Sequence, residues 1–175
     1  QDEGTYHITV GCTDMGTGCD TIIAQFAADV LETPIDNISV YGVDTDISPY
    51  DSGSYASSTT YLTGMAAVKA CEQLRERIIA LAAVRMNKDA SALTFDGENV
   101  IDESDGAKMS LFDIATASMC NNEISLEVTY SHSSPVSPPP FMAACAEIEA
   151  DPETGAIELL DYTACVDCGT VVNTN

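Results

Sequence analysis

The first 43 residues constrain the fold most, because strand, turn, helix and strand patterns follow one another there. Residues 6–12 alternate apolar and polar side chains as a strand does. A glycine-rich turn follows at 14–18, and residues 37–43 predict a second strand. Between them one helix face is apolar: Ile22, Ile23, Phe26, Ala27, Val30 and Leu31. The pattern predicts a β-turn-α-β unit.

The limits of that first helix are marked by familiar residues. Asp20 or Thr21 could cap its start, because their side-chain oxygens accept hydrogen bonds from unpaired backbone N–H groups. Pro34 cannot continue a helix and marks its end.

A long helix is predicted from about Thr59 to Met86. Apolar residues recur at every fourth position and are expected to face the core: Leu62, Ala66, Ala70, Leu74, Ile78, Ala82 and Met86. Residues 92–103 predict a hairpin that turns at Asp96-Gly97. A short helix is expected at 110–120 and a strand at 123–130.

The C-terminal part predicts a β-hairpin at 141–166. A stiff connection at Pro138-Pro139-Pro140 precedes it. Strands at 141–150 and 156–166 flank the turn sequence Asp-Pro-Glu-Thr-Gly. Because helices and hairpins are mixed, we expect an α+β fold, with mixed sheets, one long helix and two shorter helices, in one domain or two small lobes sharing a core.

Charge narrows the range of partners. The chain has 28 Asp and Glu against 6 Lys and Arg, a formal net charge of −22. Such a surface repels nucleic acid and anionic membranes, so neither is expected as a partner. It either keeps the protein soluble or faces basic surfaces on partner chains.

The cysteines and the apolar runs indicate the compartment. Seven cysteines, an odd number, are scattered through the chain, which disfavours a secreted disulfide framework. No signal peptide and no run of membrane-spanning length is visible. We expect a reduced, cytoplasmic setting.

Two segments rich in small residues could carry chemistry. Residues 11–21 place glycines between a strand and a helix start, where backbone N–H groups can approach a ligand closely. Residues 51–60 place hydroxyl groups before the long helix. Either segment alone is equally compatible with an ordinary turn or capping loop, and Asp14 and Asp20 disfavour a phosphate site in the first.

Taken together and in order, the segments resemble the molybdenum hydroxylases, the family of xanthine dehydrogenase, aldehyde oxidase, nicotinate dehydrogenase and 4-hydroxybenzoyl-CoA reductase. The resemblance rests on Asp-Met-Gly-Thr-Gly-Cys-Asp-Thr at 14–21, the loop at 51–61 and Gly64-Met65-Ala66. Residues 140–149 and 167–173 resemble a later hairpin of the family. The sequence is most similar to bacterial, purine-type xanthine dehydrogenases.

The resemblance implies a cofactor site for molybdopterin. The turn at 15–18 would lie alongside the pyranopterin, and the backbone of Ala56 would lie near the molybdenum. The hydroxyl groups of Ser57 and Thr59 would donate hydrogen bonds to the pterin or its phosphate. The family usually has Gln where this chain has Thr17, so a side-chain contact at that position would differ. The residues expected to bind the cofactor are Met15, Gly16, Thr17, Gly18, Ser54, Ala56, Ser57 and Thr59.

The reaction that the resemblance implies is oxidation of a heterocycle, such as a purine, or of an aldehyde with oxygen derived from water. The family's general-base glutamate is expected outside this chain, so no catalytic residue is assigned here. A 2Fe-2S cluster and FAD are expected on partner chains or domains, together with the remaining parts of the molybdenum subunit. A start without Met and an end at Asn175 lead us to expect a partial domain, residues 1–175, of a larger polypeptide.

Other interpretations stay open. The chain could be a non-catalytic acidic interaction domain with the same fold, or a subunit of the nicotinate dehydrogenase or aryl-CoA reductase type. A third possibility is a thiol-redox module that uses Cys165 and Cys168, although a single Cys-x-x-Cys at a strand end is weak evidence for redox or metal chemistry. His7 and His132 are expected to be structural or surface residues, and Glu147 and Glu149 to lie on a solvated strand face.

Overall fold

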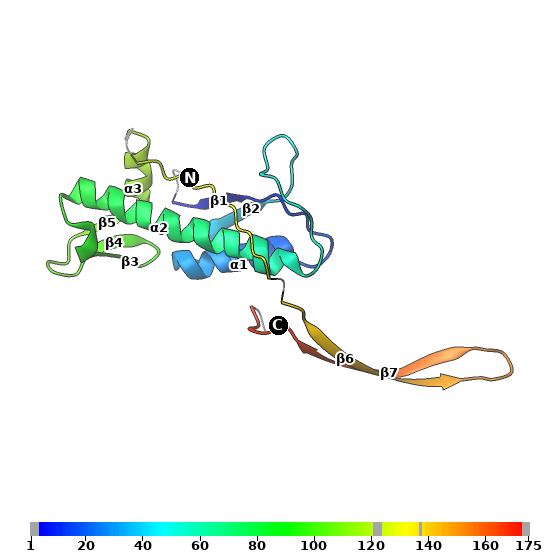
Figure 1. Ribbon diagram of the computed structural model, residues 1–175. Helices are drawn as coiled ribbons and strands as arrows, with labels where there is room; N and C mark the ends of the chain where they lie inside the picture. Colours follow the sequence, from blue (N-terminus) through cyan, green and yellow to red (C-terminus); the bar gives the residue numbers. More distant parts are fainter. Residues whose placement is uncertain (1–3, 121–123, 137, 173–175) are drawn as a thin grey trace. The chain divides into compact units, whose positions relative to one another are not determined.

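The computed structural model describes residues 4–120, 124–136 and 138–172. The chain divides into two compact units, Gln1–Pro135 and Val136–Asn175 (Figure 1). None of the helices in these described ranges has the length and apolar character needed to cross a membrane.

The N-terminal unit opens with the predicted β-turn-α-β arrangement. Strand β1 (Tyr6–Thr9) pairs in parallel with β2 (Ile38–Tyr41), and α1 (Cys19–Leu31) connects them. Two parallel strands cannot be joined by a tight turn, so a crossover of this kind is required. A short 3-10 turn, η1 (Ile35–Asn37), leads into β2.

Helix α1 begins earlier than expected and without a side-chain cap. Its N-cap is Gly18, in the left-handed region at φ 76°, and neither Asp20 nor Thr21 caps the helix. Both of those residues lie inside the first turn, so the predicted cap was wrong. The helix ends at Glu32, whose left-handed backbone lets its N–H donate to the carbonyl of Ala28 before Pro34.

The long helix α2 (Gly64–Met86) follows a five-residue π-helix, η2 (Thr59–Thr63). Of the predicted fourfold stripe only Ile78 and Ala82 are buried. Leu74 and Met86 are partly buried and pack against the same core, so the prediction is confirmed for four of the seven residues. Leu62, Ala66 and Ala70 do not belong to this core, because a helix has 3.6 residues per turn and a spacing of four drifts by about 40° each step. The buried side is instead Gly64, Ala67, Cys71, Ile78, Leu81, Ala82 and Ala83.

A small antiparallel sheet follows α2. After the 3-10 turn η3 (Ala90–Ala92), strands β3 (Leu93–Phe95) and β4 (Asn99–Asp102) form the predicted hairpin. Strand β5 (Lys108–Ser110) extends the sheet in the order β3-β4-β5 and was not predicted. Helix α3 (Leu111–Ser118) then begins where the Ser110 hydroxyl accepts from the N–H of Asp113. One long and two shorter α-helices in the described ranges, with small mixed sheets, confirm the α+β class.

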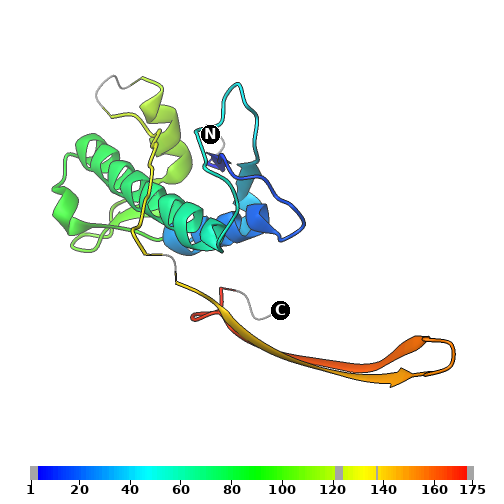
Figure 2. The ribbon, with the colours of Figure 1, turned by 45° about the vertical axis from the view of Figure 1, so that its right-hand side comes forward.

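The strand predicted at 123–130 is absent from 124–130, and position 123 lies outside the described residues. The guanidinium of Arg77 on α2 donates to the carbonyls of Ser125 and Glu127, at 3.1 Å for Ser125. A side chain therefore satisfies these acceptors in place of a neighbouring strand. The segment runs alongside α2 in both ribbon views (Figures 1 and 2).

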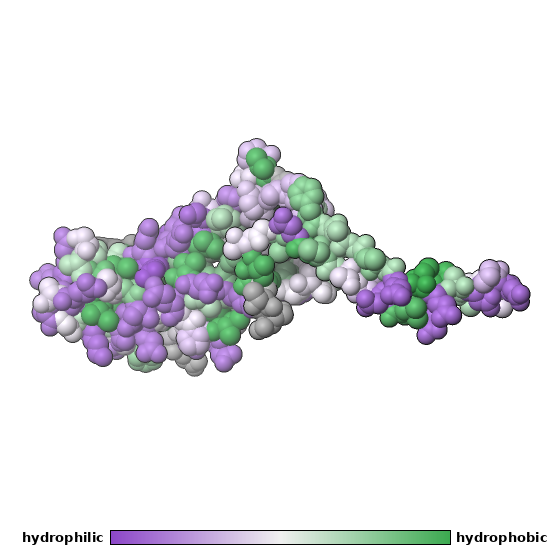
Figure 3. All heavy atoms as spheres, turned by 90° about the horizontal axis from the view of Figure 1, so that it is seen from below, coloured by the Kyte–Doolittle hydropathy of each residue, from purple (hydrophilic) through white to green (hydrophobic). Residues whose placement is uncertain are grey.

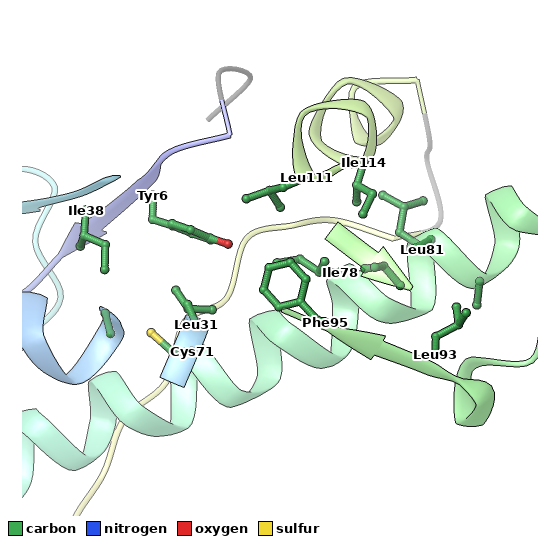
Figure 4. Close-up of a cluster of buried hydrophobic side chains, with 14 of the residues drawn as sticks. Tyr6, Leu31, Ile38, Cys71, Ile78, Leu81, Leu93, Phe95, Leu111 and Ile114 are labelled. Carbon is green, nitrogen blue, oxygen red and sulfur yellow. The ribbon is translucent and has the colours of Figure 1, made fainter. Parts of the chain in front are cut away.

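The core of this unit joins both sheets to the helices (Figure 4). Tyr6, Leu31, Ile78, Phe95 and Ile114 come from different elements and point toward one another. A second, smaller cluster lies where β1 leaves its sheet and α1 begins: Val10, Cys12, Cys19, Ile23 and Ala67. This smaller cluster packs the first candidate segment, through Cys12 and Cys19, against Ala67 of α2.

The C-terminal unit is a long hairpin of β6 (Phe141–Ala150) and β7 (Ile157–Asp167). The register is antiparallel, with a bulge where Glu147 pairs with Asp161 but Ile148 pairs with Leu159, so that Leu160 is unpaired. Both strands match the prediction to within one residue. Position 173, which belongs to the resemblance, lies outside the described residues.

The register sorts the hairpin side chains onto two unlike faces. One face is apolar throughout: Met142, Ala144, Ala146, Ile148, Ala150, Ile157, Leu159, Tyr162, Ala164 and Val166. The other carries the acidic side chains Glu147, Glu149, Glu158, Asp161 and Asp167. Figure 3 shows green hydrophobic side chains between purple hydrophilic ones on this hairpin. Glu147 and Glu149 are exposed, as predicted.

Candidate cofactor site

The two candidate segments belong to the same unit and touch at their bases. A Cβ atom on Gly11 would lie 2.3 Å from the carbonyl oxygen of Pro49 and 2.8 Å from Cβ of Asp51. Only glycine allows this approach. The structure therefore brings together residues 11 and 49–51, which stand forty positions apart in the chain.

The tips of the segments are open. A Cβ atom on Gly16 or Gly18 would meet nothing within 4 Å. Met15 is 64% exposed, and Thr17, Ala56 and Ser57 are exposed as well. Of the predicted residues, Met15, Gly16, Thr17, Ala56 and Ser57 are thus exposed, whereas Gly18, Ser54 and Thr59 are partly buried.

Asp14 organises the first tip. One oxygen of its carboxylate, Oδ1, accepts the backbone N–H groups of Gly16, Thr17 and Gly18 at 2.8, 3.0 and 3.2 Å. These hydrogen bonds, of which the one from Gly16 has the largest effect, hold the pKa of Asp14 below its usual value. The amides that the sequence offered for a ligand are therefore bound to the protein's own carboxylate.

Two buried thiols lie beneath this turn. The sulfur atoms of Cys12 and Cys19 are 4.0 Å apart, and both residues are free and almost fully buried. Burial raises the pKa of both thiols, that of Cys19 to about 12. A thiol that resists ionisation is a poor nucleophile and metal ligand, so the pair forms an apolar floor under the turn.

Asp51 fixes the base of the second segment. Its Oδ1 accepts from the N–H of Gly53 at 2.7 Å, and its Oδ2 accepts from the hydroxyl of Thr63 at 3.1 Å. Because Thr63 closes η2, this carboxylate ties the loop to the start of the long helix.

The backbone at the second tip is unusual. Ala56 and Ser57 are consecutive non-glycine residues in the left-handed region, at φ 52° and 58°. Such residues are uncommon there, and each costs of order 1–3 kcal/mol unless its surroundings compensate. Ser58 supports the turn, with its N–H donating to Tyr55 at 3.0 Å and its hydroxyl donating to the carbonyl of Gly53 at 3.2 Å.

The second segment fits a polar heterocyclic cofactor better than the first. Ala56 is exposed and has the smallest side chain after glycine, so a ligand can approach it closely. Within the described ranges, the hydroxyls of Ser57 and Thr59 make no hydrogen bond and can donate one to a ligand. The first segment offers carbonyl oxygens and the exposed side chains of Met15 and Thr17, because Asp14 occupies its amides.

No ready-made metal centre is visible in the part of the chain that the structure describes, where no three His, Cys, Asp or Glu side chains gather to hold an ion. Nδ1 of His7 lies 3.0 Å from the Ser39 hydroxyl, a contact across β1 and β2. Cys165 lies in β7 and Cys168 after its end, both free and exposed. Ser54, at the start of the second tip, is partly buried.

Three residues of the predicted segments, Gly11, Asp14 and Asp51, shape the site in ways that were not predicted. Each left a signal. Asp-x-Gly at 14–16 and at 51–53 is typical of turns in which a carboxylate accepts from the backbone two residues later. Gly11 ends a strand pattern, a place where glycine often marks a close backbone approach.

Comparison with known proteins identifies the family. A family model described as the molybdopterin cofactor-binding domain matches residues 1–175. The protein named Probable hypoxanthine oxidase XdhD, of Escherichia coli strain K12, is 35% identical over 99% of this chain, which spans 18% of that protein. The xanthine dehydrogenase molybdenum-binding subunit of Escherichia coli O157:H7 is 30% identical over 85% of the chain, which spans 20% of that subunit.

Solved structures show the same fold. The reconstituted CO dehydrogenase from Oligotropha carboxidovorans superposes with a TM-score of 0.75 at 24% identity, over 93% of this chain and 21% of that one. The carbon monoxide-reduced Cu,Mo-CO dehydrogenase superposes with a TM-score of 0.70 at 27% identity, over 94% of this chain and 21% of that one. The chain thus spans about a fifth of these relatives and belongs to the molybdopterin cofactor-binding domain family of the molybdenum hydroxylases.

Proposed function

We propose that this chain supplies two cofactor-holding segments, residues 11–21 and 51–60, to a molybdenum hydroxylase. The whole enzyme oxidises a purine, another heterocycle or an aldehyde with oxygen taken from water. A 2Fe-2S cluster and FAD on partner chains or domains would take up the electrons. The observation that carries the proposal is the contact of Gly11 with Pro49 and Asp51, which joins the two segments at their bases.

The two tips have different tasks in this proposal. Ala56, an exposed residue, would place its backbone near the metal centre, and the hydroxyls of Ser57 and Thr59 would donate hydrogen bonds to the pterin or its phosphate. Met15, Gly16, Thr17, Gly18 and Ser54 line the pterin's path. When bound, the molybdenum centre accepts the two electrons of the oxidation.

Positioning is what this chain contributes, because a constrained loop holds its groups in place before the ligand arrives. The left-handed backbone at Ala56 and Ser57 is fixed by the hydrogen bonds of Ser58 and by Asp51 behind it. Such preorganisation reduces the entropy lost on binding. The general-base glutamate of the family is not assigned to any residue of this chain.

The test is to purify the complex that contains this chain and to measure molybdenum and pterin per chain. We expect both in the wild-type complex and a several-fold loss of both in Ala56→Val, because a β-branched residue resists the left-handed region. Ala92→Val, at an exposed site in η3, is the matched control and should load normally. A folded complex without molybdenum and pterin, or full loading of Ala56→Val, would contradict the proposal.

A second candidate is the non-catalytic acidic interaction domain. The observation that favours it is the Asp14 carboxylate, which fills the amides at the first tip. This alternative predicts a stable complex free of molybdenum, so the same measurement separates the two functions.

A further inference from the structure

The turn at residues 14–18 already holds an anion, and that anion belongs to the chain. The N–H groups of Gly16, Thr17 and Gly18 converge on a single oxygen, Oδ1 of Asp14. The left-handed backbone of Gly16 at φ 98° and of Gly18 at φ 76° directs these donors inward. Successive amides in such a turn form a concave anion-binding arrangement.

Without Asp14 the same turn would be suited to a phosphate. It precedes the 13-residue helix α1, whose N-terminus carries unpaired N–H groups and a partial positive charge. Phosphate binds readily to helix starts that follow glycine-rich turns. The carboxylate of Asp14 prevents phosphate from binding there, because it adds negative charge and already accepts hydrogen bonds from the three N–H groups.

We propose that Asp14 is a positioning residue that makes this turn reject phosphate and other anions. The turn then meets a cofactor only through its carbonyl oxygens and the side chains of Met15 and Thr17. An anionic end of the cofactor is thereby directed away from residues 14–18. That last consequence rests on the proposed function, whereas the exclusion of anions does not.

Two neighbouring acids strengthen the exclusion. Asp20 lies in the first turn of α1 and faces Gly42, and Asp51 lies near the thiol of Cys12 beneath the turn. Neither acid accepts from the amides of residues 16–18 in the described structure, so Asp14 alone occupies the donors. Removing Asp14 frees these three donors.

The experiment is an NMR titration of the full 175-residue chain with inorganic phosphate, following the amide signals of Gly16, Thr17 and Gly18. In the wild type we expect these signals to stay constant at phosphate concentrations up to about 50 mM. In Asp14→Ala they should shift together and saturate, with a dissociation constant on the order of 10 mM. Asp29→Ala removes the same charge from an exposed site on α1 and should behave like the wild type.

A merely structural role for Asp14 predicts no gain of phosphate binding in the variant. Wild-type signals that saturate with phosphate, or an Asp14→Ala chain that folds without gaining the site, would overturn the proposal. If Asp14→Ala does not fold, Asp14→Asn replaces it. The amide oxygen can still accept from the turn, but without the negative charge phosphate can compete for the same N–H groups. Shifts of the same three signals are therefore expected, saturating at a higher phosphate concentration than in Asp14→Ala.

A second measurement connects the residue to the cofactor. In the purified complex, Asp14→Ala should contain several-fold less pterin than Asp29→Ala, because the turn is no longer held in one conformation. Equal pterin content in the two variants would reject the positioning role. A wild-type complex without any pterin would instead count against the proposed function, and the phosphate result would still stand.

Discussion

At the scale of single residues, burial of polar groups sets the largest local energies. Tyr6 is 7% exposed, and its hydroxyl has no hydrogen-bond partner among the described residues. Burial raises the pKa of this phenol well above its usual value. A buried donor without a partner lowers the free energy of unfolding by about 1–3 kcal/mol, because it loses its hydrogen bonds to water and forms none in the protein.

Replacing Tyr6 with Phe should therefore raise the free energy of unfolding by about 1 kcal/mol, because the ring stays and only the unpaired hydroxyl is removed. Urea unfolding followed by circular dichroism measures this change. Tyr41→Phe, at a 46% exposed site, is the control and should change stability by less than about 0.5 kcal/mol. A loss of stability in Tyr6→Phe would mean that the hydroxyl has a partner, such as a buried water.

Asp102 is the opposite case, a buried carboxylate with good partners. It is 2% exposed, Nζ of Lys88 lies 2.8 Å from its Oδ2, and Ser104 donates to its Oδ1 through backbone N–H and hydroxyl. The Lys88 ammonium, with Ser104, lowers the pKa of Asp102 to about 2.

The sign of the resulting pH dependence follows from that shift. Because the folded pKa lies below the unfolded one, the fold gains stability from Asp102 above its usual pKa of 3.8, and loses it as the pH falls toward about 2. Urea unfolding at several pH values should show a shallower acid dependence for Asp102→Asn than for the wild type in this range. Identical slopes would refute the assignment, and Asp29→Asn should keep the wild-type slope.

At the scale of elements, much of the arrangement could be predicted because it follows from side-chain periodicity. The β-turn-α-β unit, the long helix and the C-terminal hairpin all carry strong patterns. Strand β5 carries no such pattern, since three residues are too few to show a period. The turn sequence Asp105-Gly106 is the local signal that precedes it. The segment at 124–130 has a strand pattern, but Arg77 satisfies its carbonyls, a contact between distant residues that no local pattern encodes.

The candidate site divides in the same way. The sequence located both tips, because small residues and glycines are visible in it. It did not reveal which groups occupy the amides of residues 16–18, since that depends on the backbone angles of Gly16 and Gly18. It also did not reveal the contact between Gly11 and Pro49, which depends on tertiary packing.

That contact leads to a prediction at the element scale. Gly11→Ala would force a Cβ atom within 2.3 Å of the Pro49 carbonyl and so push the two cofactor segments apart. We expect destabilisation of about 1–3 kcal/mol, typical of overpacking, and a several-fold loss of bound pterin from the complex. Gly42→Ala is the matched control, because its Cβ would lie 3.6 Å from Asp20, an ordinary contact. Normal pterin content in Gly11→Ala would show that the contact does not hold the site together.

At the scale of the whole molecule, charge repulsion dominates. A net charge of −22 on 175 residues destabilises a compact state, and residues 136–175 contribute seven acidic side chains and no Lys or Arg. The chain's six basic residues can neutralise few of its acidic charges. Three of the six form the described ion pairs: Lys69–Glu72, Arg75–Glu32, Lys88–Asp102 and Lys88–Asp105.

Salt should therefore stabilise the chain. Raising NaCl from about 0.01 M to about 0.5 M shortens the screening length severalfold, which weakens repulsion between exposed carboxylates. We expect the urea midpoint of unfolding to rise over this range, while sucrose at equal osmolality gives a smaller rise. A midpoint that falls with salt would mean that the few ion pairs outweigh the repulsion.

The bulge in the hairpin also determines which changes of length the strand can tolerate. Strand β7 holds one spare residue, Leu160, between the partners of Glu147 and Ile148. Deleting Leu160 keeps Ile157 and Leu159 on the apolar face, where Leu159 pairs with Ile148. Deleting Thr163 instead moves Asp161 opposite Ala146, so that a carboxylate lies among the apolar side chains. Chains of this family that are one residue shorter in the hairpin should therefore have lost that residue at the bulge.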